Sequence, residues 1–357
     1  MGVSTGLDDG NAGEALSSYL RTQATAFLRG LGLRGDDEDT ADALLRGSAR
    51  RIAGVLHTYG VLTDPAWAEP MRTELGWLGA TLGREPQYAV RLGRLLDALR
   101  RLSVLAPAEE ALTAAAAPLP QGADGGAGAE PAGGARRSAG AAVAARGTVP
   151  AQSSGPLAVG AARAAALLER QLTLARTRAH SATLQAMGSA RFHALADSIA
   201  LLASEVPLTA RAAEPADQVL PPLAGQAHTR LADAAGTLPL RRAGHPYNAE
   251  AVQAALGADL TADLQDAPWH QVRILLRLSR YAAEVPGAGG HGDPRLAEAA
   301  LVLQRHHEAA ESAAAVAAAA RTPRIAPATA YALGVLHADQ RHEVEAARFA
   351  FSRLWQS

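Results

Sequence analysis

Residues 270–284, HQVRILLRLSRYAAE, place a strongly basic set of side chains in a segment that otherwise looks like a core helix. At about 100° per residue, the charged side chains share an arc of about 80°, which holds His270, Arg273, Arg277, Arg280 and Glu284. A second arc is apolar and holds Ile274, Leu275, Leu278 and Ala282, with Tyr281 at the border. We predict a helix whose apolar arc packs and whose basic arc faces a cavity.

The charge on this face is uneven. A solvated helix face usually interleaves glutamate with arginine at i,i+4, because opposite charges at that spacing stabilise the helix. Here three arginines accompany a single carboxylate at the far end. Like charges at helical spacing repel, so we expect a compensating anion, either a carboxylate of the protein or a ligand.

A second segment, residues 43–60 (ALLRGSARRIAGVLHTYG), has a similar pattern. Arg46, Arg50 and His57 fall within about 40° of one another, and Arg51 lies at the border of this face. More than 200 residues separate the two basic segments. This separation suggests an internally duplicated architecture.

Composition narrows the possible functions. The chain has 357 residues, 48% of them apolar, and no cysteine or lysine, so all 34 basic residues are arginine. Thiol catalysis, disulfides, Schiff-base chemistry and the lysine of a phosphate-binding P-loop are therefore excluded. The start of the chain has no signal-peptide pattern, and no apolar run is long enough for a membrane helix, so we expect a cytoplasmic protein. The net charge of −1 argues against a general nucleic-acid binder.

Helix-forming residues dominate the chain, and the sequence predicts an all-α protein with about ten helices. Helices should start near residues 12 and 38, and another should start at Asp64–Pro65 and stop at Gly83. Proline predicts breaks at Pro207, Pro215, Pro221, Pro246, Pro268 and Pro286. Residues 107–156 are rich in Ala, Gly and Pro, and we interpret them as a flexible insertion.

The segment 270–284 resembles the signature of the CHAD domain, the conserved histidine α-helical domain. The matching residues are His270, Arg273, Arg277, Arg280, Tyr281 and Glu284, whereas Leu278 replaces a basic residue. Residues 44–60 resemble the other copy of that signature, with Ala43 in place of its histidine and Ala53 in place of an arginine. In the similar stretch 74–90, Pro86 and Gln87 replace an Arg-Asp pair, and the stretches around Arg191, Gln304 and Leu336 also fit.

The resemblance implies a specific fold and a specific ligand. CHAD domains are all-α, with two helical bundles around a shared basic cavity, and the family is associated with inorganic polyphosphate. By this reading residues 12–357 form one CHAD-like domain. Its first bundle comprises residues 12–106 and 157–210, and its second comprises residues 211–357. Guanidinium groups suit phosphate oxygens, which agrees with the resemblance.

We therefore predict a non-enzymatic protein that binds inorganic polyphosphate. Such binding would associate it with polyphosphate granules. The predicted contact residues are His270, Arg273, Arg277, Arg280, Tyr281, Arg46, Arg50, Arg51, His57, Arg84 and Arg191. We expect no cofactor, metal, nucleic acid or membrane partner, and the sequence does not determine the oligomeric state. Two alternatives stay open, a structural ion network in place of the anion site and a degenerate scaffold that binds a protein partner.

Overall fold

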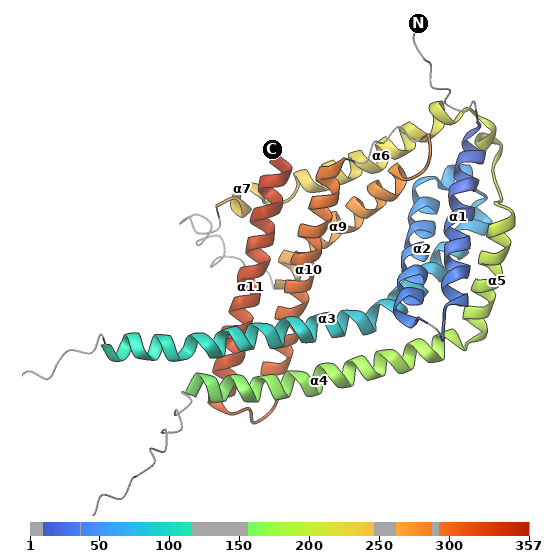
Figure 1. The fold of residues 1–357 in the computed structure, drawn as a ribbon. Helices are drawn as coiled ribbons and strands as arrows, with labels where there is room; N and C mark the ends of the chain where they lie inside the picture. Colours follow the sequence, from blue (N-terminus) through green and yellow to red (C-terminus); the bar gives the residue numbers. More distant parts are fainter. Residues whose placement is uncertain (1–9, 36, 116–155, 246–261, 288–292, 357) are drawn as a thin grey trace, which may run out of the picture.

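The computed structural model describes residues 10–35, 37–115, 156–245, 262–287 and 293–356. Within these ranges all regular secondary structure is helical, with ten α-helices and two short 3₁₀ turns (Figure 1). The all-α prediction is confirmed.

The two N-terminal helices start where the sequence predicts. Helix α1 spans Ala12–Gly32, and the Asn11 side chain accepts a hydrogen bond from the Glu14 amide at 2.8 Å. Helix α2 spans Glu38–Thr58, and Asp37 accepts one from the Thr40 amide at 3.0 Å. Both caps satisfy amides that a helix start leaves without a partner, so local side chains account for these boundaries.

Two long helices, α3 (Pro65–Ala115) and α4 (Pro156–Met187), lie side by side and run in opposite directions (Figure 1). Asp64 caps α3 as predicted, but the predicted stop at Gly83 is wrong. A helical glycine costs only about 1 kcal/mol relative to alanine, and buried residues before and after it, such as Leu82 and Leu95, offset that cost. Residues 107–115, predicted to belong to the insertion, continue α3, and residues 116–155 lie outside the described residues.

The connecting helices follow some of the predicted breaks. A 3₁₀ turn, η1, covers Gly60–Leu62, and α5 covers Ala190–Ser204. The chain then breaks around Pro207 and Pro215, on either side of the 3₁₀ turn η2 (Ala210–Ala213). The predicted break at Pro221 is wrong, because α6 (Ala216–Gly236) continues through it. Its neighbours Val219 and Leu220 are buried, and their packing outweighs the hydrogen bond that proline removes.

The C-terminal helices bring the second basic segment into the fold. After the short α7 (Leu240–Ala243), α9 covers Ala262–Ala283, α10 covers Pro294–Ala320 and α11 covers Pro327–Gln356. The break at Pro286 is confirmed, whereas Pro268 lies inside α9 beside the buried Trp269. The position predicted for a break at Pro246 lies outside the described residues.

Three main hydrophobic clusters hold these helices together. One joins α1, α2, α5, the first half of α3, the start of α6 and the end of α9, and a second joins the end of α6 to α7, the rest of α9, α10 and α11. A third joins the second half of α3 to α4, α10 and α11. Since α3, α6, α9, α10 and α11 each enter more than one cluster, single helices run from one core to the next. The two-bundle division and the internal duplication remain predictions.

Helix α9 packs through a different face from the one predicted. Its buried stripe contains Trp269, Val272, Leu276 and Ala282, whereas Ile274 is 46% exposed. The predicted packing of Ile274 is therefore wrong. A helical wheel locates an apolar arc, but the neighbouring helices decide which part of it is covered. In this structure Ile274 lies beside the basic face.

Candidate anion-binding pocket

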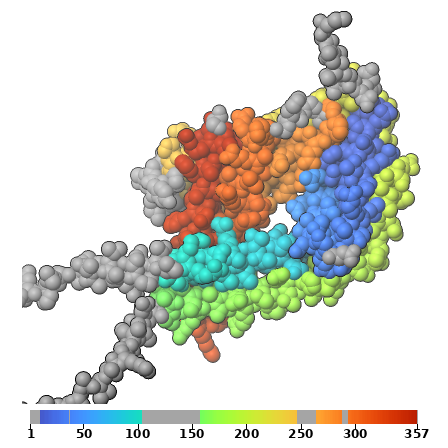
Figure 2. Space-filling view, in the orientation of Figure 1, coloured from blue at the N-terminus to red at the C-terminus, as the bar shows by residue number. Residues whose placement is uncertain are grey.

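A pocket of about 820 Å³ lies between helices α2, α3, α9 and α10. The space-filling view shows the molecule hollowed between these helices (Figure 2). Both basic segments contribute to it, since Arg46 and Arg50 of α2 and Arg273 and Arg277 of α9 line its wall. This volume falls in the range of ordinary ligand sites.

The two pocket arginines of α9 form no ion pair with any acidic residue that the structure describes. Arg273 donates a hydrogen bond from Nη1 to Gln304 Oε1 at 3.1 Å, while its buried Nε has no partner among the described residues. Within the described chain, Arg277 has neither a hydrogen bond nor an ion pair from its side chain. Burial, together with the positive charges of Arg277 and Arg50, lowers the pKa of Arg273 to about 10. Burial also lowers the pKa of Arg277. Both cations would be stabilised by an anion in the pocket.

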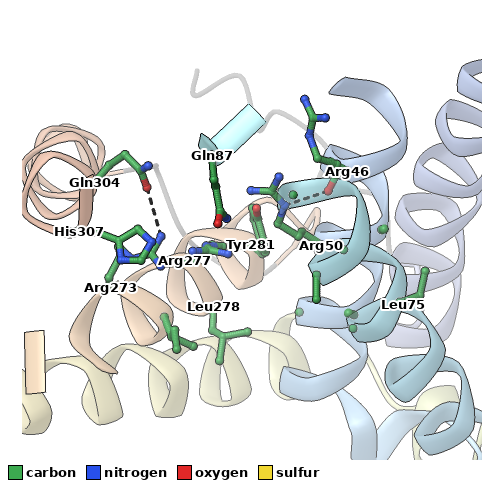
Figure 3. A pocket seen from close by; sticks show the side chains of 18 of the residues that line it. Arg46, Arg50, Leu75, Gln87, Arg273, Arg277, Leu278, Tyr281, Gln304 and His307 are labelled. Carbon is green, nitrogen blue, oxygen red and sulfur yellow. Dashed lines mark hydrogen bonds between the residues drawn. The ribbon is translucent and has the colours of Figure 1, made fainter. Parts of the chain in front are cut away.

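Helix α2 contributes two arginines to the pocket, and only one of them is paired with a carboxylate. Arg46 contacts Asp42 at 3.4 Å, and Asp42 also accepts a hydrogen bond from Arg34 at 3.0 Å. Arg50 donates from Nε to the Arg46 carbonyl at 3.0 Å and has no carboxylate partner in the described part of the chain. Arg50, Arg273 and Arg277, which we call the unneutralised arginines, point into the same space from two helices (Figure 3).

The carboxylates on the pocket wall are already engaged. Six arginines and three glutamates line the pocket, which leaves a formal excess of three positive charges. Glu311 accepts a hydrogen bond from Arg91 at 2.7 Å, and Glu69 accepts one from Arg72. Glu308 accepts one from the Gln304 amide at 2.8 Å. None of these glutamates forms an ion pair with the unneutralised arginines, although Glu311 and Glu308 raise the pKa of Arg273 at longer range.

Glu284, the carboxylate at the end of the α9 signature, does not pair with the arginines of α9 that line the pocket. It accepts hydrogen bonds from Arg51 Nε at 2.9 Å and from the Tyr19 hydroxyl at 2.7 Å. The Arg51 guanidinium also lies over the ring of Tyr281, 5.5 Å from its centroid. Arg51 does not line the pocket but holds the lining residue Tyr281 in place across the α2–α9 contact.

The two predicted histidines lie at different distances from the pocket. His270 does not line it, and its Nε2 lies 3.3 Å from Nδ1 of His307, which does. Burial lowers the pKa of His307 to about 3, and the positive charge of Arg273 contributes. His57 lines the pocket, and its Nδ1 lies 3.0 Å from Nη2 of Arg72. Burial lowers the pKa of His57, and the positive charge of Arg72 is the second cause. These rings are neutral near pH 7.

The remaining predicted contacts lie elsewhere. Arg280 and Arg84 are exposed and do not line the pocket. Arg191 donates from Nε and Nη2 to the Glu74 carboxylate, and its guanidinium lies 4.1 Å from the Trp77 ring centroid. An arginine held by a carboxylate and an aromatic ring is stabilised within the protein.

A family model for the CHAD domain matches residues 18–304, which is most of the chain. The chain belongs to the CHAD domain family. A solved structure of PptA from Streptomyces chartreusis is 49% identical, with a TM-score of 0.73, and the match covers 98% of this chain and 100% of that chain. No curated protein matches the chain.

Several positions at which the sequence differs from the signature it resembles lie in the pocket. Ala53, Pro86, Gln87 and Leu278, each of which stands in place of a charged residue, line its wall, whereas Ala43 does not. Part of the pocket wall is therefore uncharged.

Several lining residues were missing from the predicted site, and they come from α3 and α10. They are Arg72, Gln87, Arg91, Gln304 and His307. The helical repeat could have placed Arg72, Gln87 and Arg91 on one face, but a helix that stops at Gly83 hides this relation. Among the described residues, no three His, Asp or Glu side chains gather as a metal site would require.

Proposed function

We propose that this CHAD domain binds inorganic polyphosphate and that Arg50, Arg273 and Arg277 are its main contacts. The observation that carries the proposal is the convergence of these three unneutralised arginines in one pocket, while the nearby glutamates are engaged with other side chains. A buried guanidinium without an anion is unfavourable, so a bound phosphate relieves a cost already present in the free protein.

The chemistry of the ligand fits the side chains. Guanidinium groups donate paired hydrogen bonds to phosphate oxygens and remain charged at any physiological pH. Consecutive phosphates of a chain could contact Arg273 and Arg277 on α9 and Arg50 on α2. A polyanion also releases counterions when cationic groups neutralise it, so its affinity falls as salt rises.

We propose a binding protein rather than an enzyme. The lining glutamates that could act as general bases already accept hydrogen bonds from arginine or glutamine side chains.

The described part of the chain contains no helix that combines the length and the apolar character of a membrane span. A cytoplasmic location and association with polyphosphate granules are part of the proposal.

A salt titration tests the proposal. Binding of long-chain polyphosphate to the purified protein is measured from about 50 to 200 mM salt, a range over which multi-phosphate contacts weaken strongly. We expect Arg273→Gln/Arg277→Gln to bind about 100-fold more weakly than the wild type, since each charge-assisted hydrogen bond contributes roughly 1.5–3 kcal/mol. Arg280→Gln is the matched control, because Arg280 lies on the same helix but outside the pocket. Equal binding by the double variant and this control would refute the proposed site.

A second candidate function is a protein-binding scaffold that has lost strong polyphosphate binding. The uncharged replacements on the pocket wall, Ala53 and Leu278, favour it. The same titration separates the two candidates, because the scaffold predicts that the wild type binds as weakly as the double variant even at the lowest salt.

A further inference from the structure

The pocket has an apolar side as well as a basic one. Leu278 and Ile274 of α9 and Val90 of α3 line it, and Ile274 and Val90 are 46% and 50% exposed. Single exposed apolar residues are common on protein surfaces, but apolar groups gathered in a concave wall beside polar anchors are typical of ligand sites. In Figure 3 Leu278 and Leu75 lie on the side of the pocket away from the labelled guanidiniums.

Glycines of α3 widen this apolar side. Gly76, Gly79 and Gly83 lie within about 60° of one another on the helix and all line the pocket. A Cβ atom added at Gly76 or Gly79 would meet nothing within 4 Å. Glycine is unfavourable inside a helix, and no packing contact requires it at these two positions. Its result is free space in the pocket along the α3 face that also carries Arg72 and Val90.

An inorganic polyphosphate cannot use this side of the pocket, because it has no apolar atoms. We propose that the pocket binds a water-soluble phosphate ester that carries a hydrocarbon chain. Its phosphate contacts Arg50, Arg273 and Arg277, and its chain lies along Ile274, Val90 and the α3 glycines. The inference rests on the proposed function only for the phosphate contacts of these three arginines, and it names a second class of ligand for the same pocket.

Chain-length dependence tests the inference. Methyl, butyl and hexyl phosphate are titrated into the full chain by calorimetry below their aggregation concentrations, with long-chain polyphosphate titrated in parallel. Each methylene removed from water strengthens binding by roughly fourfold, so hexyl phosphate should bind at least about tenfold more tightly than methyl phosphate even if only two methylenes are covered.

Two variants locate the effect. Gly79→Leu fills the free space and Ile274→Ser removes apolar contact, and each should abolish the chain-length dependence while inorganic polyphosphate is still bound. Gly225→Leu is the matched control, since Gly225 is helical, lies outside the pocket and has nothing within 4 Å of its Cβ position. Vesicles containing phosphatidic acid separate a soluble ester from a membrane lipid. The inference would be overturned if the protein bound these vesicles but not hexyl phosphate, and if Gly79→Leu left the vesicle binding unchanged.

The possible outcomes distinguish failure of this inference from failure of the proposed function. Polyphosphate binding with equal affinity for methyl and hexyl phosphate overturns the inference alone, as does chain-length dependence that survives in Gly79→Leu. Absence of binding for both polyphosphate and all esters overturns the inference together with the proposed function. Chain-length dependence that Arg273→Gln/Arg277→Gln abolishes, without polyphosphate binding, supports the inference and replaces inorganic polyphosphate as the ligand.

Discussion

The basic segments of α2 and α9 line one pocket, but they treat their charges differently. In α2, Arg46 contacts Asp42 and Arg51 contacts Glu284, so Arg50 is the remaining pocket arginine without a carboxylate. In α9, neither Arg273 nor Arg277 has an acidic partner among the described residues. Glu284, the carboxylate that ends the α9 segment, forms its ion pair with Arg51 of α2. The comparison shows that two similar sequence patterns can differ in how their arginines are paired: the two pocket arginines of α9 form no ion pair among the described residues, whereas Arg51 of α2 makes the contact between the helices.

The largest expected difference is between paired substitutions on the two helices. Arg273→Gln/Arg277→Gln should weaken polyphosphate binding about 100-fold, and Arg46→Gln/Arg51→Gln less than about tenfold, because the α2 pair already interacts with carboxylates. Fluorescence titration of both double variants at one salt concentration provides the comparison. Equal losses would mean that the two segments contribute equally.

The contact between the helices should be sensitive to a single methyl group. A Cβ atom at Gly54 would lie 2.8 Å from Cδ2 of Tyr281, closer than real contacts allow. Gly54→Ala should therefore lower the free energy of unfolding by about 2 kcal/mol, measured by urea denaturation. Gly225→Ala meets nothing within 4 Å and should be neutral or stabilising. An unchanged stability in Gly54→Ala would show that α2 and α9 are not held this tightly.

Within α2, Arg50 should matter more than Arg46 for binding. Arg50→Gln removes a pocket cation that has no carboxylate partner and should weaken polyphosphate binding about tenfold. Arg46→Gln removes a cation that Asp42 already contacts, so its effect should be only a few-fold. The reverse order would show that contact with Asp42 does not prevent Arg46 from binding phosphate.

The histidine beside the α9 arginines should make stability depend on pH. Burial and Arg273 lower the pKa of His307 to about 3, whereas an unfolded histidine titrates near 6.5. As pH falls below about 6.5 the unfolded chain binds a proton that the folded chain does not, so stability falls, by at most about 1.4 kcal/mol per pH unit. His307→Gln should reduce this slope between pH 6 and pH 4 in thermal unfolding. A slope identical to that of the wild type would contradict the lowered pKa.

Periodicity accounts for much of the fold and for the α9 contribution to the site. The arginine spacing on α9 and the caps at Asn11 and Asp37 act within one or two helical turns, so the sequence predicted Arg273, Arg277 and two helix starts. The α3 face was missed because local rules end the helix at Gly83, whereas the packing of Leu95, Ala98 and Leu99 continues it beyond that residue.

Long-range pairing explains the other differences. The carboxylate that holds Arg191, Glu74, lies 117 residues away in sequence, and the one that holds Arg51 lies 233 residues away. No helical period reveals such partners, so an arginine that binds a ligand and one that binds its own protein look alike in sequence. The exposure of Ile274 depends in the same way on where the neighbouring helices lie.

A crystal structure of the protein with inorganic tripolyphosphate tests the central claim most directly, because phosphorus positions identify the contacting side chains. The account predicts phosphate oxygens within hydrogen-bond distance, about 2.7–3.2 Å, of Arg273, Arg277 and Arg50 in the pocket between α2 and α9. Tripolyphosphate bound instead at the exposed Arg280 or Arg84, with the pocket arginines uncontacted, would contradict it.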